Sequence, residues 1–174
     1  MAAQAEAKKR PSLLSDLLFL LMKIGLILVF LVVIFTFFFG ITQVSGNAMS
    51  PAVKDGDLVI YYRLDRDYAA DDLAVISRKG RLSVRRVVGI AGDKVDINSQ
   101  NGLEINGYPQ QEDNIYTKTL PVVGGAKFPL TVGENSVFVL GDNRPYAKDS
   151  RTYGTVSVGD TRGKVLAVIR RRNL

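Results

Sequence analysis

The chain has 174 residues, a formal net charge of +6 and 47% hydrophobic residues, and it contains no His, Cys or Trp. This length suits one domain with a substantial core. Without His and Cys the chain cannot build a His-based triad, a thiol nucleophile, a disulfide or a zinc site of Cys and His ligands. Any catalysis must therefore use Ser, Thr, Lys, Tyr or carboxylates.

The N-terminal third is organised around one apolar run. Residues 1–12 are small and polar and are predicted to form a cytoplasmic tail. Residues 13–41 are predicted to form a transmembrane anchor helix, because Ile24–Ile41 carries no charge and is long enough to cross most of a bilayer. The cationic Lys8–Arg10 precedes the run, so the positive-inside rule predicts a single-pass plasma-membrane protein with a cytoplasmic N-terminus and residues 42–174 outside the cell.

A cleavable export signal is the competing interpretation of the apolar run. Gly46 and Ala48 are small residues at the spacing that a processing enzyme prefers. The run is longer than the roughly 7 to 15 residues of a signal-peptide core, however. A buried core helix is the other alternative, and it is disfavoured because the run is apolar on every face. A retained anchor is therefore the preferred interpretation.

Residues 42–174 change to short β-type runs separated by Gly, Asp and Asn, which predicts a mostly antiparallel β-domain without a substantial helix. Apolar residues alternate on either side of NSQNG and predict a hairpin. The segment Gln110–Pro129 lacks a clear period and is expected to be an exposed loop. The basic residues 170–172 are interpreted as solubilising charge, with contact to an anionic lipid or cell-wall polymer as the alternative. The predicted strands are DLVIYYR, DLAVIS, LSVRRVVGI, DKVDI, LEING, SVFVLGD and GKVLAVIRR.

Three segments carry a family resemblance. GNAMSPAV followed by KDGDLVIYYR resembles the nucleophile box of type I signal peptidases, VRRVVGIAGD resembles the box of the general-base lysine, and VFVLGDNRPYAKDSRTYGTV resembles the GDN and Asp-Ser-Arg signature. LEING and the closing RGKV also match in order and spacing. The resemblance runs from about residue 15 to the end, and the single anchor with a short insert is similar to the Gram-positive type.

This resemblance implies a signal-peptidase-like antiparallel β-domain preceded by one N-terminal transmembrane helix. It also implies a serine and lysine dyad, in which a serine hydroxyl attacks the carbonyl after a small-x-small sequence and a neutral lysine accepts the proton. No cofactor, metal or nucleic-acid partner is implied. The implied partners are the membrane and an extended segment of an exported protein.

The catalytic positions of this family are altered here. Ala48 stands at the nucleophile position, and its methyl group cannot attack a carbonyl. Arg85 stands at the general-base position, and a guanidinium stays protonated in proteins. Ala147 stands where many members have a serine that holds the lysine amine by a hydrogen bond. These three changes predict an inactive dyad, although an engineered Ser-to-Ala change would explain position 48 alone.

The remaining motif residues are interpreted as a scaffold that braces the site rather than as catalytic acids. Asp149 is expected to pair with Arg144 or Arg151, an interaction that matters mainly if it is partly buried. The scaffold consists of Gly46, Met49, Pro51, Arg86, Gly141, Asp142, Asn143, Arg144, Asp149, Ser150 and Arg151.

Other hydroxyls lie near the altered dyad in sequence. Ser45 and Ser50 are interpreted as turn residues. Ser83 shares a strand face with Arg85 by alternation, and Lys79 precedes Arg85 by six positions. A fixed cation beside a hydroxyl does not provide a base, so rescue of the chemistry by these residues is disfavoured.

Three functions remain open from the sequence. The preferred one is a noncatalytic accessory protein or chaperone that holds an exported protein, with a pilin or a pilus sortase of sortase-dependent pilus assembly as the favoured partner. The groove of such a protein can still bind an extended peptide as an added strand. The alternatives are an active divergent signal peptidase that bypasses Ala48, and an anchored β-domain whose boxes serve folding only.

Overall fold

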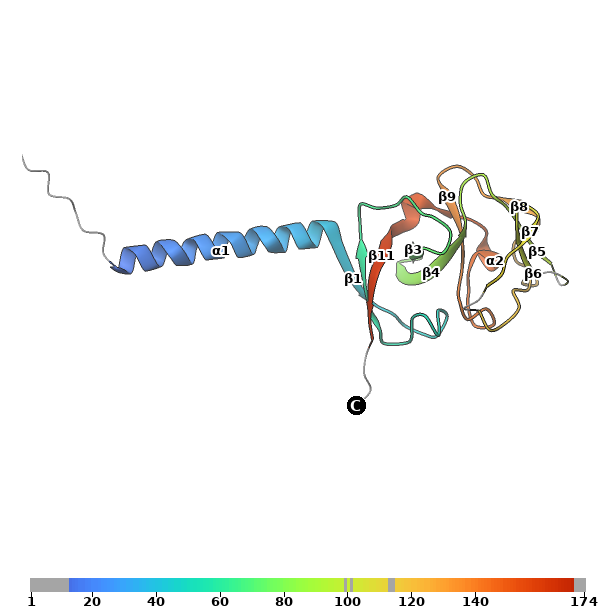
Figure 1. Cartoon of the computed structure of the whole chain (residues 1–174), viewed down its shortest axis with the longest axis horizontal. Helices are drawn as coiled ribbons and strands as arrows, with labels where there is room; N and C mark the ends of the chain where they lie inside the picture. The colour runs from blue at the N-terminus through green and yellow to red at the C-terminus, as the bar shows by residue number, and fades with distance from the viewer. Residues whose placement is uncertain (1–12, 99, 101, 113–114, 171–174) are drawn as a thin grey trace, which may run out of the picture. The chain divides into compact units, whose positions relative to one another are not determined.

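The computed structural model describes residues 13–98, 100, 102–112 and 115–170 (Figure 1). The predicted tail, residues 1–12, lies outside the described residues, as do residues 171 and 172 of the C-terminal basic cluster. The chain divides into two compact units, one ending at Phe37 and the other starting at Phe38, and each is described by itself.

The helix α1, Leu13–Phe38, belongs to the first unit except for its last residue, and none of its residues is buried. This helix is long and apolar enough to cross a membrane. It ends at Phe38 and not at Ile41 as expected, because Phe39–Gln43 forms the strand β1, which pairs antiparallel with β2, Leu58–Tyr62. Gly40 disfavours helix, Ile41 and Thr42 are β-branched and favour extended backbone, and β2 supplies the hydrogen-bonding partner.

The second unit is a β-domain whose main sheet has seven strands in the order β1-β2-β11-β3-β4-β9-β10. All its neighbouring strands run antiparallel. Two short helical turns accompany it, α2 (Ser150–Tyr153) and the 3-10 turn η1 (Val158–Asp160). The remaining strands of this sheet are β3 (Leu73–Arg78), β4 (Arg81–Gly89), β9 (Ser136–Leu140), β10 (Val156–Ser157) and β11 (Thr161–Ile169).

A smaller sheet has the order β7-β6-β5-β8. Figure 1 shows these short strands together at one end of the β-domain, with β1 and β11 at the other. The predicted hairpin is confirmed, since Val95 pairs with Ile105 and Ile97 with Leu103. The strands are β5 (Lys94–Asn98), β6 (Gly102–Ile105), β7 (Tyr108–Pro109) and β8 (Leu130–Thr131).

Strand alternation divides the core of the main sheet between its two faces. Val75 and Val84 are register partners and belong to one buried cluster, whereas Ala74 and Val87 belong to a cluster on the other face. Each fully buried valine contributes about 1.5 to 3 kcal/mol relative to an exposed one. Successive residues of β4 are therefore fixed to opposite sides of the sheet by the packing of their apolar neighbours.

The expectation of an exposed loop over Gln110–Pro129 is wrong in part. The described residues of this segment form no helix or strand, as expected. Thr119, however, is 1% exposed, and its hydroxyl donates to Glu112 at 2.7 Å. Arg144, after the end of β9, donates to Glu112 at 2.9 Å and so holds the segment in place by a polar contact that hydrophobic periodicity does not report.

Candidate functional site

The first part of the site is the turn that carries Ala48. Gly46 adopts φ 84°, a conformation that glycine tolerates without a Cβ clash, and its amide donates to Asp55 Oδ1 at 2.6 Å. Met49 is 1% exposed and packs into the core cluster around Val84. The cis peptide Ser50–Pro51 follows directly. The buried Met49 anchors the turn, so Ala48 is held at a defined position.

A second segment, at the end of β9, holds this turn from the other side. The Asn143 amide donates to Ala48 O at 3.1 Å, and Asn143 Nδ2 donates to Asn47 O at 3.1 Å. Gly141 has no room for a side chain, because a Cβ there would lie 2.6 Å from Ala48 O and would also collide with the Ala147 Cβ. Ala48, at the nucleophile position, and Ala147, at the dyad-support position, therefore both lie against Gly141.

Arg85 lies beside this turn, on β4. Its Nε and Nη2 both donate to Lys148 O, at 3.2 and 3.0 Å, and its Nη1 donates to Val84 O at 2.6 Å. Arg85 and Ala48 line the same narrow groove. The guanidinium is thus committed to backbone carbonyls, and it offers no lone pair to a proton.

The groove runs along an edge of β4. Leu82–Arg85 pairs with β3 on one side, whereas β9 begins to pair only at Arg86. No described strand pairs with Leu82–Arg85 on the β9 side, and residues 42–46 line the opposite wall of the groove. Its volume of about 20 Å³ is room for one water or one methyl-sized side chain.

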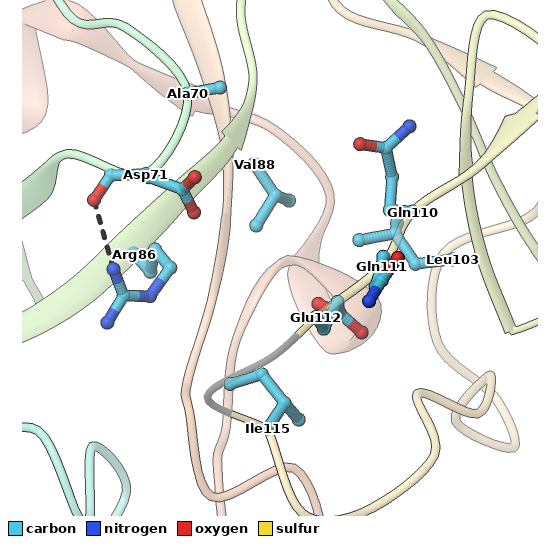
Figure 2. A pocket seen from close by; sticks show the side chains of 9 residues that line it. All are labelled: Ala70, Asp71, Arg86, Val88, Leu103, Gln110, Gln111, Glu112 and Ile115. Carbon is cyan, nitrogen blue, oxygen red and sulfur yellow. Dashed lines mark hydrogen bonds between the residues drawn. The ribbon is translucent and has the colours of Figure 1, made fainter.

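Arg86 points to the other face of β4, away from Arg85. Its Nε and Nη2 donate to the Asp142 carboxylate at 2.8 and 2.7 Å, and Asp142 is 3% exposed. This bidentate hydrogen bonding raises the pKa of Arg86 despite its partial burial. Arg86 and Asp71, whose carbonyl accepts from Arg86 Nη1 at 3.1 Å, line one side of a pocket of about 290 Å³, with Gln110 and Glu112 across from them (Figure 2).

Asp149 forms the most buried ion pair of the site. It is 0% exposed, caps α2, and accepts from Arg151 N, Nε and Nη2 at 3.1, 2.9 and 2.9 Å and from Gly141 N at 3.1 Å. Next to it, the buried Ser150 hydroxyl accepts from the Val139 amide at 3.0 Å. Asp149 thus connects the end of β9 to α2. Of the two partners expected from the sequence, Arg144 and Arg151, it pairs with Arg151.

Arg144 pairs instead with a residue that the sequence did not single out. Its Nη1 and Nη2 donate to Glu112 at 2.9 and 2.5 Å, its Nε donates to Gly141 O at 2.9 Å, and its Nη1 also contacts the Thr119 hydroxyl. Arg144 is 2% exposed. Glu112 and Thr119 belong to the segment expected to be an exposed loop, and no local pattern signals a partner 32 residues away.

The structure therefore brings Ala48, Arg85 and Ala147 together and surrounds them with hydrogen-bonded charges. Arg86, Asp142, Arg144, Asp149 and Arg151 all carry structural partners. Within the described residues no group of three or more acidic side chains is positioned to hold a metal ion.

Comparison with known proteins places the chain in a family. Residues 17–169 match the family described as signal peptidase, peptidase S26. The chain belongs to this family of serine peptidases, and its membership together with the apolar helix α1 indicates membrane anchoring.

Individual relatives agree with this assignment. The chain is 32% identical to a signal peptidase I of Mycobacterium tuberculosis (strain CDC 1551) over an alignment of 104 residues, and the match covers 49% of this chain and 35% of that protein. It is 29% identical to signal peptidase IB of Staphylococcus aureus (strain Mu50) over an alignment of 142 residues, and the match covers 70% of this chain and 73% of that protein. The crystal structure of a signal peptidase I from Enterococcus faecalis V583 matches with a TM-score of 0.47 at 29% identity, over 58% of this chain and 97% of that one. The chain thus spans about a third of the length of the mycobacterial relative.

Proposed function

We propose that this chain is a noncatalytic signal peptidase I homologue that holds an extended segment of an exported protein at the membrane without cutting it. One observation carries this proposal. At the general-base position, the Arg85 guanidinium donates to Lys148 O and Val84 O beside the methyl group of Ala48. Peptide hydrolysis by this family needs an attacking oxygen and a proton acceptor at these two positions, and this chain supplies neither.

The unpaired edge of β4 supports binding. Residues Leu82–Arg85 can accept an extended peptide as an added strand, which supplies backbone hydrogen bonds independent of the lost side chains. The small groove beside Ala48 accommodates a methyl-sized side chain of such a peptide. The amide of residue 48 also remains a donor, because it does not depend on the side chain.

We infer the orientation of the chain in the membrane from the charge pattern, and the partner from the family resemblance. The cationic residues 8–10 before the apolar helix favour a cytoplasmic N-terminus and an extracellular β-domain. The resemblance to degenerate signal peptidase homologues that assist pilus assembly favours a pilin or a pilus sortase as the partner. Co-purification of the tagged chain with these proteins from pilus-forming cells, lost on deletion of residues 42–174, tests this part of the proposal.

An active divergent peptidase is the rival function, and one observation favours it: Ser83 and Lys79 line one cavity together with Arg85. In that case Ser83→Ala abolishes cleavage of a labelled preprotein. In the noncatalytic account Ser83→Ala changes nothing, because the unaltered chain releases no product. If the chain neither binds nor cleaves the preprotein, the remaining explanation is an anchored β-domain whose motifs serve folding only.

Restoration of the dyad tests the noncatalytic account more directly. The triple variant Ala48→Ser, Arg85→Lys, Ala147→Ser returns a nucleophile, a titratable amine and its hydrogen-bonding support to one site. We expect this variant to process a labelled preprotein at a detectable rate. The matched control is the double variant Arg85→Lys, Ala147→Ser, which gains the amine but keeps Ala48 and must stay inactive. Cleavage by that control would contradict the assigned nucleophile position.

A further inference from the structure

An open cavity of about 690 Å³ adjoins the altered dyad and has an unusual charge. Five of its lining side chains are cationic, and none is acidic. Within the described residues none of these five cations takes part in an ion pair. The lining residues are Arg78, Lys79, Arg81, Ser83, Arg85, Lys148 and Tyr153.

Three of the cations, Arg78, Lys79 and Arg81, sit at the tip of the β3–β4 hairpin in an arrangement that is unfavourable for the chain alone. Arg78 and Arg81 are register partners, so like charges lie directly opposite each other across the two strands. Between them Lys79 and Gly80 adopt φ 48° and 75°. A positive φ is costly for lysine, whereas Asn or Asp would tolerate it better and would lower the repulsion. Such a local cost indicates a binding role for the hairpin.

Two guanidinium groups of the cavity are held in place before any ligand arrives. The Arg78 guanidinium carbon lies 3.6 Å from the centre of the Tyr153 ring, over its face. Arg85 is fixed by its bonds to Lys148 O. Because much of its side-chain entropy is already lost, the Arg78 fork is suited to bind a carboxylate with little further ordering cost. Arg85 donates to backbone carbonyls and so contributes a fixed positive charge to the cavity wall.

The cavity adjoins the small groove beside Ala48. Ser83 and Arg85 line both, so a peptide that extends along β4 from Ala48 reaches the cationic cavity within a few residues. We propose that the segment held by this chain is acidic, with Asp or Glu side chains that bind among Arg78, Lys79, Arg81 and Lys148. This inference rests on the proposed function, because it assumes a peptide in the groove. An anionic membrane is the less suitable ligand, because two of the cations are fixed inside a concave site shared with the groove.

The test uses the full chain in neutral detergent and two sets of fluorescent peptides. Both sets contain an Ala-x-Ala core, flanked on either side by a block of Glu and Asp in one set and by the matching Gln and Asn in the other. At low ionic strength we expect the acidic set to bind about tenfold more tightly, with the difference shrinking as salt screens the charges. The double variant Lys79→Gln/Arg81→Gln must remove that difference.

The control is Lys94→Gln/Lys127→Gln, which lowers the net charge equally by changing two exposed lysines outside the cavity. This control must keep the preference for the acidic set. Lys148→Gln, which removes a cation of the cavity on a separate segment, must weaken that preference. Equal binding of both sets would overturn the inference and leave the proposed function intact. Binding of neither set would overturn both. The inference would also be overturned if substitution of the cavity cations weakened binding to phosphatidylglycerol nanodiscs but left binding of the acidic peptides unchanged.

Discussion

Asp149→Asn is predicted to destabilise the β-domain strongly. Asp149 accepts two bonds at each carboxylate oxygen, from Arg151 N and Nε on Oδ1 and from Gly141 N and Arg151 Nη2 on Oδ2. An asparagine keeps one acceptor oxygen and turns an NH₂ group toward the other two donors. Two buried donors then lose their acceptor, at about 1 to 3 kcal/mol each, and the buried Arg151 cation loses its counter-charge. The expected loss is about 3 to 5 kcal/mol of unfolding free energy.

Urea unfolding in neutral detergent, followed by the near-ultraviolet circular dichroism of the tyrosines, measures this loss. Hydrogen exchange adds a local readout, since the Gly141 amide bonds to Asp149 itself whereas the Val139 amide bonds to Ser150. The Gly141 amide should therefore lose more protection. Asp67→Asn, at an exposed position, is the matched control and should stay within about 0.5 kcal/mol of the unaltered chain. A similarly small effect of Asp149→Asn would refute the account of this ion pair.

Three further predictions concern the surroundings of the site. Gly141→Ala should displace the Ala48 carbonyl, lower the unfolding free energy by about 1 to 3 kcal/mol and weaken peptide binding. Urea unfolding and fluorescence anisotropy measure these two effects, and unchanged binding would argue against the contact. Glu112→Gln should cost about 2 kcal/mol by removing the counter-charge of Arg144, with faster exchange of the following loop as the readout; no change in exchange would contradict the role of this pair. Burial raises the pKa of Tyr153, so this tyrosine favours folding below pH about 10 and loses that contribution as pH rises through its folded-state pKa. Unfolding free energy should thus fall less steeply above that pH in Tyr153→Phe, and parallel profiles would show that the residue does not contribute.

The fold was predictable where strands are short, alternating and bounded by turn residues. The pairing of Val95 with Ile105 illustrates this, because each hairpin strand carries its own period and the turn fixes the register. The strand β1 was not predictable in the same way. Phe39–Gln43 continues the apolar run of the helix, and hydropathy does not distinguish the end of an apolar helix from a strand that pairs with a partner further along the chain.

The site was predictable in position but not in its contacts. Motif order brought Ala48, Arg85 and Ala147 to one candidate site, and the structure places them close together. The bonds from Arg85 to Lys148 O span 63 residues, and no sequence rule gives them. The pairing of Arg144 with Glu112 was missed for the same reason. Long-range polar contacts depend on the folded arrangement of loops, which leave no periodic signal in the sequence.

The most direct test of the central claim is to recover a captured preprotein and measure its mass. A labelled preprotein carrying an Ala-x-Ala site is incubated with the unaltered full chain immobilised in detergent, and the bound fraction is eluted and analysed by mass spectrometry. We predict intact preprotein in the bound fraction, because neither Ala48 nor Arg85 can take part in acyl transfer. Recovery of a leader fragment cut after the Ala-x-Ala core, in a preparation free of other peptidases, would contradict the account.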